Sequence, residues 1–197
     1  MNKTRFNFPA ILILFAALLG ACSGNATPAV PEIAADFTLP DSNGNMVNLA
    51  DELQENEQVV LVFYYDYVCT LCMSQLRTIE NDRSKYEEMG AQVIAIAVQD
   101  DRGAEASART SQAQFPILAD SDHAVAEAYG VYDLLPEDEG LSTPSVFVIN
   151  HDRQIVWRHI ASSIFEEGEE PSYPTCGEDR VPSETILENL IDISEQS

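Results

Sequence analysis

The sequence predicts an α/β fold in which helices cover a central sheet. Three mostly apolar runs of seven or eight residues suit strands buried on both faces of a sheet: residues 59–65, 91–98 and 143–150. Stretches with helical spacing lie between them, and strands that alternate with helices are typical of layered α/β proteins. The 197 residues suffice for one such domain with a sizeable core.

Two short extended stretches open the predicted domain. Residues 35–40 and 46–49 flank Asn43-Gly44, a dipeptide that favours tight hairpin turns, so we expect an N-terminal β-hairpin. Residues 50–58 are polar and predict a short helix and a loop before the strand at 59–65.

One long helix is predicted after this strand, over residues 73–90. Apolar residues recur on one face and Gly90 provides a C-terminal cap. The remaining predicted elements are a helix at 100–114, an extended stretch at 115–118, a helix at 122–129, a hairpin strand at 155–160, an acidic loop at 163–179 and a helix at 183–193.

A Cys-x-x-Cys pair, Cys69 and Cys72, lies between the strand at 59–65 and this helix. A helix N-terminus offers free N–H groups and partial positive charge, which favour a thiolate. Cysteines at this spacing can close a disulfide, so the pair can exchange two electrons. A static disulfide is the alternative. We predict a redox-active Cys69–Cys72 disulfide.

Zinc binding is not favoured by the remaining residues. A structural zinc site needs about four ligands. The other candidates, Cys176, His123, His151 and His159, include no second close pair. We therefore expect no metal and no cofactor.

The first 21 residues have the make-up of a signal peptide. Lys3 and Arg5 precede an apolar run at 10–19 that is short for a membrane span, and Leu19-Gly20-Ala21-Cys22 resembles the bacterial lipobox. The resemblance implies cleavage before Cys22, a lipid on its sulfur, and a flexible tether over 22–32. It places the protein in the bacterial cell envelope, extracytoplasmic and held at a membrane by the lipid alone. Ordinary secretory cleavage is the alternative.

Acidic residues dominate the charge. The formal net charge is −23, and it becomes −25 when a segment carrying only Lys3 and Arg5 is removed. Nucleic acid and anionic membrane surfaces would repel such a folded domain, so we exclude them as partners.

Four segments resemble AhpC/TSA (peroxiredoxin-type) and TlpA/ResA-like redoxins. The hairpin at 35–49 is similar to their opening hairpin, and 60–76 to their active-site strand and helix. Residues 115–131 and 143–150 are similar to their middle region and to the proline-containing strand opposite the site. The resemblance implies a thioredoxin-like fold over 33–195, with a central mixed sheet flanked by helices.

Departures from the peroxiredoxin pattern favour disulfide exchange. The peroxidatic cysteine aligns with Cys72, the family threonine with Cys69 and the family arginine with Pro144. The resemblance implies that Cys69 attacks, that Cys72 resolves, and that Pro144 is a cis proline beside them. The alternatives are a thiol peroxidase with Cys72 as peroxidatic cysteine and a non-catalytic binding lipoprotein on the same scaffold.

Secondary site residues complete the prediction. Asp66, like Pro144, is expected to shape the site; it could relay a proton or be a solvated loop carboxylate. Cys176 could be a resolving cysteine or a lone surface thiol. The buried acid of thioredoxins aligns with Phe63, which predicts that its proton relay is absent. The expected partners are protein thiols or disulfides, or a small hydroperoxide, and an electron donor in the envelope.

Overall fold

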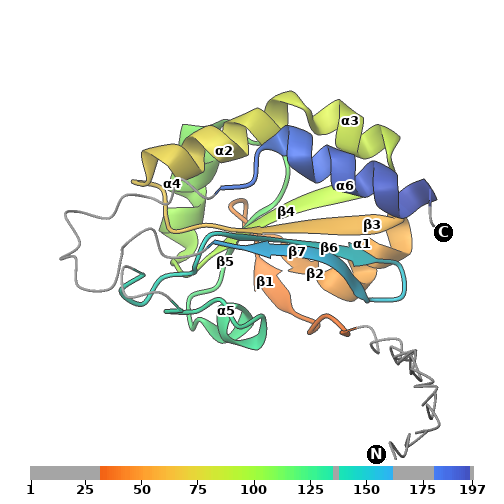
Figure 1. Ribbon diagram of the computed structural model, residues 1–197. Coiled ribbons are helices and arrows are strands. Elements are labelled where there is room, and N and C mark those ends of the chain that lie inside the picture. Colours follow the sequence, from red (N-terminus) through yellow and green to blue (C-terminus); the bar gives the residue numbers. More distant parts are fainter. Residues whose placement is uncertain (1–31, 135–137, 162–179, 196–197) are drawn as a thin grey trace, which may run out of the picture. The chain divides into compact units, whose positions relative to one another are not determined.

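A five-stranded mixed sheet forms the centre of the domain (Figure 1). The computed structural model describes residues 32–134, 138–161 and 180–195. The strands of the sheet, in spatial order, are β5 (Ile117–Ala119), β4 (Ala91–Ala97), β3 (Gln58–Phe63), β6 (Ser145–Asn150) and β7 (Ile155–Ile160). The predicted central mixed sheet is confirmed.

β3 is the middle strand and is buried along its whole length. It runs parallel to β4 and antiparallel to β6, so Val62 lies opposite Ala95 on one side and Val146 on the other. Because apolar side chains cover both of its faces, the strand shows a continuous hydrophobic run rather than an alternation.

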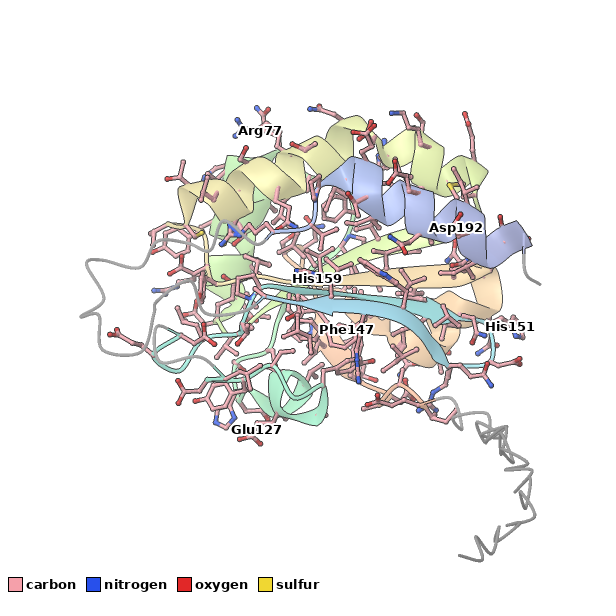
Figure 2. All side chains as sticks on the ribbon, viewed as in Figure 1. Arg77, Glu127, Phe147, His151, His159 and Asp192 are labelled. Carbon is pink, nitrogen blue, oxygen red and sulfur yellow. The ribbon has the colours of Figure 1, made fainter. Side chains whose placement is uncertain are left out.

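Helices cover both faces of the sheet. One face, with Val60 and Val62 of β3, packs against α2 (Thr70–Asn81), α3 (Arg83–Glu88), α4 (Asp101–Ser111) and α6 (Ser183–Glu195), the upper layer in Figure 1. The other face packs against α1 (Leu49–Glu55) and α5 (Ala124–Ala128). On that second face Phe63, Tyr129 and Phe147 (the last labelled in Figure 2) form an aromatic cluster with ring centroids 5.2–5.8 Å apart.

The N-terminal hairpin is confirmed as β1 (Thr38–Pro40) paired with β2 (Met46–Asn48). Asp41 stabilises its turn, since one carboxylate oxygen accepts hydrogen bonds from the backbone N–H groups of Asn43 and Asn45, each 2.8 Å long. Gly44 adopts φ +83°, a left-handed conformation that glycine takes without steric cost.

The predicted single helix over 73–90 is wrong, because the chain breaks into α2 and α3 at Asp82. Asp82 has φ −97° and ψ 5°, and its carboxylate binds the Lys85 ammonium at 2.7 Å. A short acidic side chain competes for local hydrogen bonds, which disfavours the helix interior. Both pieces still present the predicted apolar stripe, since Leu76, Ile79 and Tyr86 are buried.

Side chains also tie the helices to one another. Arg77, on the outer side of α2 (Figure 2), donates a 2.7 Å hydrogen bond to the Thr110 carbonyl near the end of α4. The predicted tether over 22–32 includes Glu32. The backbone carbonyl of Glu32 accepts a 2.8 Å hydrogen bond from the Ile155 N–H at the start of β7.

Several predictions concern residues outside the described ranges: the signal peptide, the lipidated Cys22, the tether up to residue 31, the acidic loop and Cys176. Within the described ranges, no helix has the length and apolar character that crossing a bilayer requires.

Candidate active site

Cys69 and Cys72 meet at the start of α2, as predicted. Cys69 is the N-cap residue, and its sulfur accepts a hydrogen bond from the Cys72 backbone N–H at 3.2 Å. The sulfur therefore takes the place of the oxygen that usually caps a helix. Both cysteines are free thiols and both are buried, with 4% of Cys69 and 0% of Cys72 exposed.

Asp66 holds the loop that carries the first thiol. Its Oδ1 accepts hydrogen bonds from the backbone N–H groups of Val68, at 2.9 Å, and Cys69, at 3.0 Å. These contacts fix the turn that delivers Cys69 to the N-cap. Asp66 therefore positions this loop through two backbone contacts, in line with the site-shaping role expected from the sequence.

A guanidinium lies against the first thiol. Arg180 Nη2 donates a hydrogen bond to Cys69 Sγ at 3.4 Å. The neighbour of Arg180, Val181, is buried, and its carbonyl accepts a 2.9 Å hydrogen bond from Gln75 of α2. These contacts hold the backbone next to Arg180 in place. A positive charge at this distance stabilises a thiolate relative to a thiol.

Sequence reasoning missed Arg180. It found the usual peroxiredoxin arginine position occupied by Pro144 and concluded that the activating guanidinium was missing from its place. The structure supplies a guanidinium from a segment 111 residues after Cys69 in the chain. The only available signal was the scarcity of basic residues, since the whole sequence has 10.

The second thiol has a different environment. Burial raises the pKa of Cys72 far above its ordinary value, and the hydrogen bond with Cys69 raises it further. The charge of Arg180 and a backbone hydrogen bond from Tyr65 lower the same pKa, but less strongly. Cys72 is therefore held as a protonated thiol while Cys69 lies beside the cation.

The cis peptide bond expected before Pro144 is wrong, because the described residues contain no cis peptide bond. The neighbouring backbone groups already have partners within the domain. The Pro144 carbonyl accepts a 3.0 Å hydrogen bond from the Ala161 N–H, and the Thr143 N–H donates to the Val131 carbonyl at 2.7 Å. The segment thus continues the β6–β7 pairing.

A buried carboxylate lies near the site at a position that the sequence did not indicate. Phe63, which aligns with the buried acid of thioredoxins, lies in the aromatic cluster on the far face of the sheet. A different carboxylate is nevertheless fully buried. Asp138 accepts a 2.8 Å hydrogen bond from the Tyr65 hydroxyl and another from the Thr143 hydroxyl.

Exposed apolar side chains flank Cys69 along the chain. Tyr67, Val68 and Leu71 are 45%, 68% and 48% exposed and belong to the loop and first turn that contain Cys69. Among the described residues, no group of three or more His, Cys, Asp or Glu side chains has an arrangement that could hold a metal ion.

The fold and the paired thiols define a protein of the thioredoxin-like class. Within that class the chain belongs to the AhpC/TSA family, because the profile of that family matches residues 30–158.

Related proteins fall into the two groups that the sequence suggested. The chain is 29% identical to "Peroxiredoxin Bcp" of Escherichia coli over 101 residues, covering 51% of this chain and 64% of that protein. This is less than two thirds of the length of that relative. It is 27% identical to "Thiol-disulfide oxidoreductase ResA" of Bacillus subtilis over 165 residues, covering 79% and 86% of the two chains.

Solved structures show the same fold. Peroxidoxin BcpB from Mycobacterium tuberculosis matches with a TM-score of 0.60 and 26% identity, over 66% of this chain and 84% of that one. Enterococcus faecalis AhpC matches with a TM-score of 0.66 and 18% identity, over 84% and 92%.

Proposed function

We propose that the protein is a thiol–disulfide oxidoreductase in which Cys69 attacks and Cys72 resolves. The observation that carries the proposal is the asymmetry of the pair. Cys69 Sγ lies at a helix N-terminus and 3.4 Å from Arg180 Nη2, whereas Cys72 is fully buried with a raised pKa. A thiolate is the attacking species in disulfide exchange, so the sulfur beside the cation is the nucleophile.

The reaction moves two electrons to the substrate. The Cys69 thiolate attacks one sulfur of a substrate disulfide, forms a mixed disulfide and releases the other sulfur as a thiolate. The Cys72 sulfur then attacks Cys69, and its proton passes to the leaving substrate thiolate. The Cys69–Cys72 disulfide that results must be reduced by an external dithiol before the next cycle.

Insulin reduction tests this assignment, with turbidity as the readout. We expect activity in the presence of dithiothreitol, loss of activity in Cys69→Ser, and a trapped mixed disulfide in Cys72→Ser. Full activity in Cys69→Ser would overturn the assignment. A wild-type protein without exchange activity would instead favour the non-catalytic binding role.

Peroxide reduction by Cys72 is the second candidate, and the names of several relatives support it. Its attacking sulfur would be the buried one, whose raised pKa disfavours the thiolate. Stopped-flow measurement of hydrogen peroxide consumption separates the candidates. A peroxidase of this kind keeps its rate in Cys69→Ala and loses it in Cys72→Ser.

A lipid anchor on Cys22 completes the proposal. It is supported by the basic start, the apolar run and the small residues that precede Cys22. The domain would then act outside the cytoplasm and draw electrons from a donor in the envelope. Incorporation of labelled palmitate that persists in Cys22→Ala would refute the anchor.

A further inference from the structure

Asp138 is a buried carboxylate that the two-thiol mechanism does not use. It is 0% exposed, although Glu139 beside it is exposed. Its Oδ1 accepts the 2.8 Å hydrogen bond from the Tyr65 hydroxyl, and its Oδ2 accepts one from Thr143. A buried carboxylate is costly unless hydrogen bonds compensate it, so both contacts hold the side chain in one orientation.

Tyr65 connects this carboxylate to both thiols. The Arg180 guanidinium carbon lies 5.9 Å from the centroid of the Tyr65 ring, a cation–π distance, and the same guanidinium donates to Cys69 Sγ. The backbone of Tyr65 also hydrogen-bonds Cys72. Tyr65 is itself buried, so the hydrogen bond at its hydroxyl fixes the ring that supports Arg180.

We propose that Asp138 is a positioning residue for the thiol pair. It holds the Tyr65 ring, the ring holds the Arg180 guanidinium, and the guanidinium stabilises the Cys69 thiolate. The proposal rests on Cys69 being the nucleophile. It assigns a role to the geometry of the carboxylate rather than to its charge, because the described contacts from the carboxylate toward the thiols run through the Tyr65 ring and the Arg180 guanidinium.

The test measures iodoacetamide alkylation of Cys69 against pH in the full chain, with Cys69 quantified by peptide mass spectrometry. Tyr65→Phe keeps the ring and removes the hydroxyl. We expect a rate at pH 7 that is about threefold to tenfold lower, the effect of one lost hydrogen bond, and a pH midpoint that moves upward. Asp138→Ala should do the same, and the double variant should be no slower than either single one.

Two further variants show whether an effect on Cys69 comes from the position of the Asp138 side chain, from its charge, or from a general loss of stability. An asparagine can accept from Tyr65 and donate to Thr143, so Asp138→Asn should restore the wild-type profile. Tyr129→Phe is the matched control, because it loses a partly buried 2.9 Å hydrogen bond to the Ala35 carbonyl on the opposite face of the sheet. It should lower the melting temperature without moving the alkylation profile.

The outcomes are distinct from those of the proposed function. A wild-type alkylation profile in Tyr65→Phe overturns the positioning role, even if Cys69 remains the nucleophile in insulin reduction. An altered profile in Asp138→Asn equal to that of Asp138→Ala also overturns it, in favour of a charge effect. If Cys69 proves to be unreactive in the wild-type protein, the proposed function fails first.

Discussion

Two thiols three residues apart at the start of one helix occupy contrasting environments. Cys69, at the N-cap of α2, receives hydrogen bonds from the Cys72 N–H and from the Arg180 guanidinium. Cys72, one turn further, is fully buried and its pKa is raised by that burial. The two side chains are chemically identical. Their surroundings in the fold, not the Cys-x-x-Cys motif, therefore decide which cysteine is the more reactive.

The largest expected effect concerns the order of modification. Native reduced protein should be alkylated at Cys69 first, and Cys72 should react roughly a hundredfold more slowly, because burial raises the pKa of Cys72 and leaves little of its thiolate. Peptide mass spectrometry after timed iodoacetamide quenching measures both rates, and the difference should vanish in guanidinium chloride. Equal native rates would remove the basis for the comparison.

Removing the Arg180 guanidinium should reduce the difference between the alkylation rates of Cys69 and Cys72. Arg180→Ala is expected to slow Cys69 alkylation at pH 7 by about tenfold, because a charged hydrogen-bond donor to the sulfur is lost. Arg109→Ala provides the control, since Arg109 is 73% exposed and 3.9 Å from Glu105. A rate in Arg180→Ala equal to that in the control would show that the helix N-terminus alone activates the thiol.

The buried thiol should make stability depend on pH. The unfolded Cys72 thiol ionises near pH 8.5, but burial raises its pKa in the folded state. Between about pH 8.5 and 9.5 the unfolded chain therefore loses a proton that the folded chain keeps, and stability falls as pH rises, by at most about 1.4 kcal/mol per pH unit. Urea unfolding of reduced protein should show this slope, and Cys72→Ser should show a shallower one.

The smallest effect is expected at the loop before the pair. Asp66→Ala removes an acceptor shared by two backbone N–H groups and should destabilise the fold by about 1 kcal/mol. Asp66→Asn retains an oxygen acceptor and should lose less. A pH-dependent fall in Cys69 reactivity in Asp66→Asn, at unchanged stability, would instead support the proton relay.

The sheet and most helices could be predicted from the sequence because their signals are local. Residues 59–65 are apolar throughout, and Asn43-Gly44 indicates its turn directly. The break at Asp82 was missed because the apolar stripe continues across it, and periodicity alone does not register a change of backbone angle at one residue.

The cysteine pair could also be found from spacing, but its partners could not. Arg180 lies 111 residues after Cys69 in the chain. Its contact with Cys69 depends on the packing of the next residue, Val181, whose carbonyl accepts a hydrogen bond from Gln75. Asp138 lies in the run Glu137-Asp138-Glu139, which suggests a solvated acidic turn. Only the fold shows that its middle carboxylate is buried against Tyr65 and Thr143.

Because Val181 binds Gln75 only after both residues have been synthesised, activation of the Cys69 thiol by Arg180 depends on the order of synthesis. Cys69 leaves the ribosome well before Arg180, and the guanidinium reaches the sulfur only after the segment before α6 has packed against α2. The newly made thiol therefore lacks its activating charge while the chain is still unfolded and open to wrong disulfides. Alkylation of chains stalled before residue 180 should be as slow as in Arg180→Ala, and fast alkylation would refute this order.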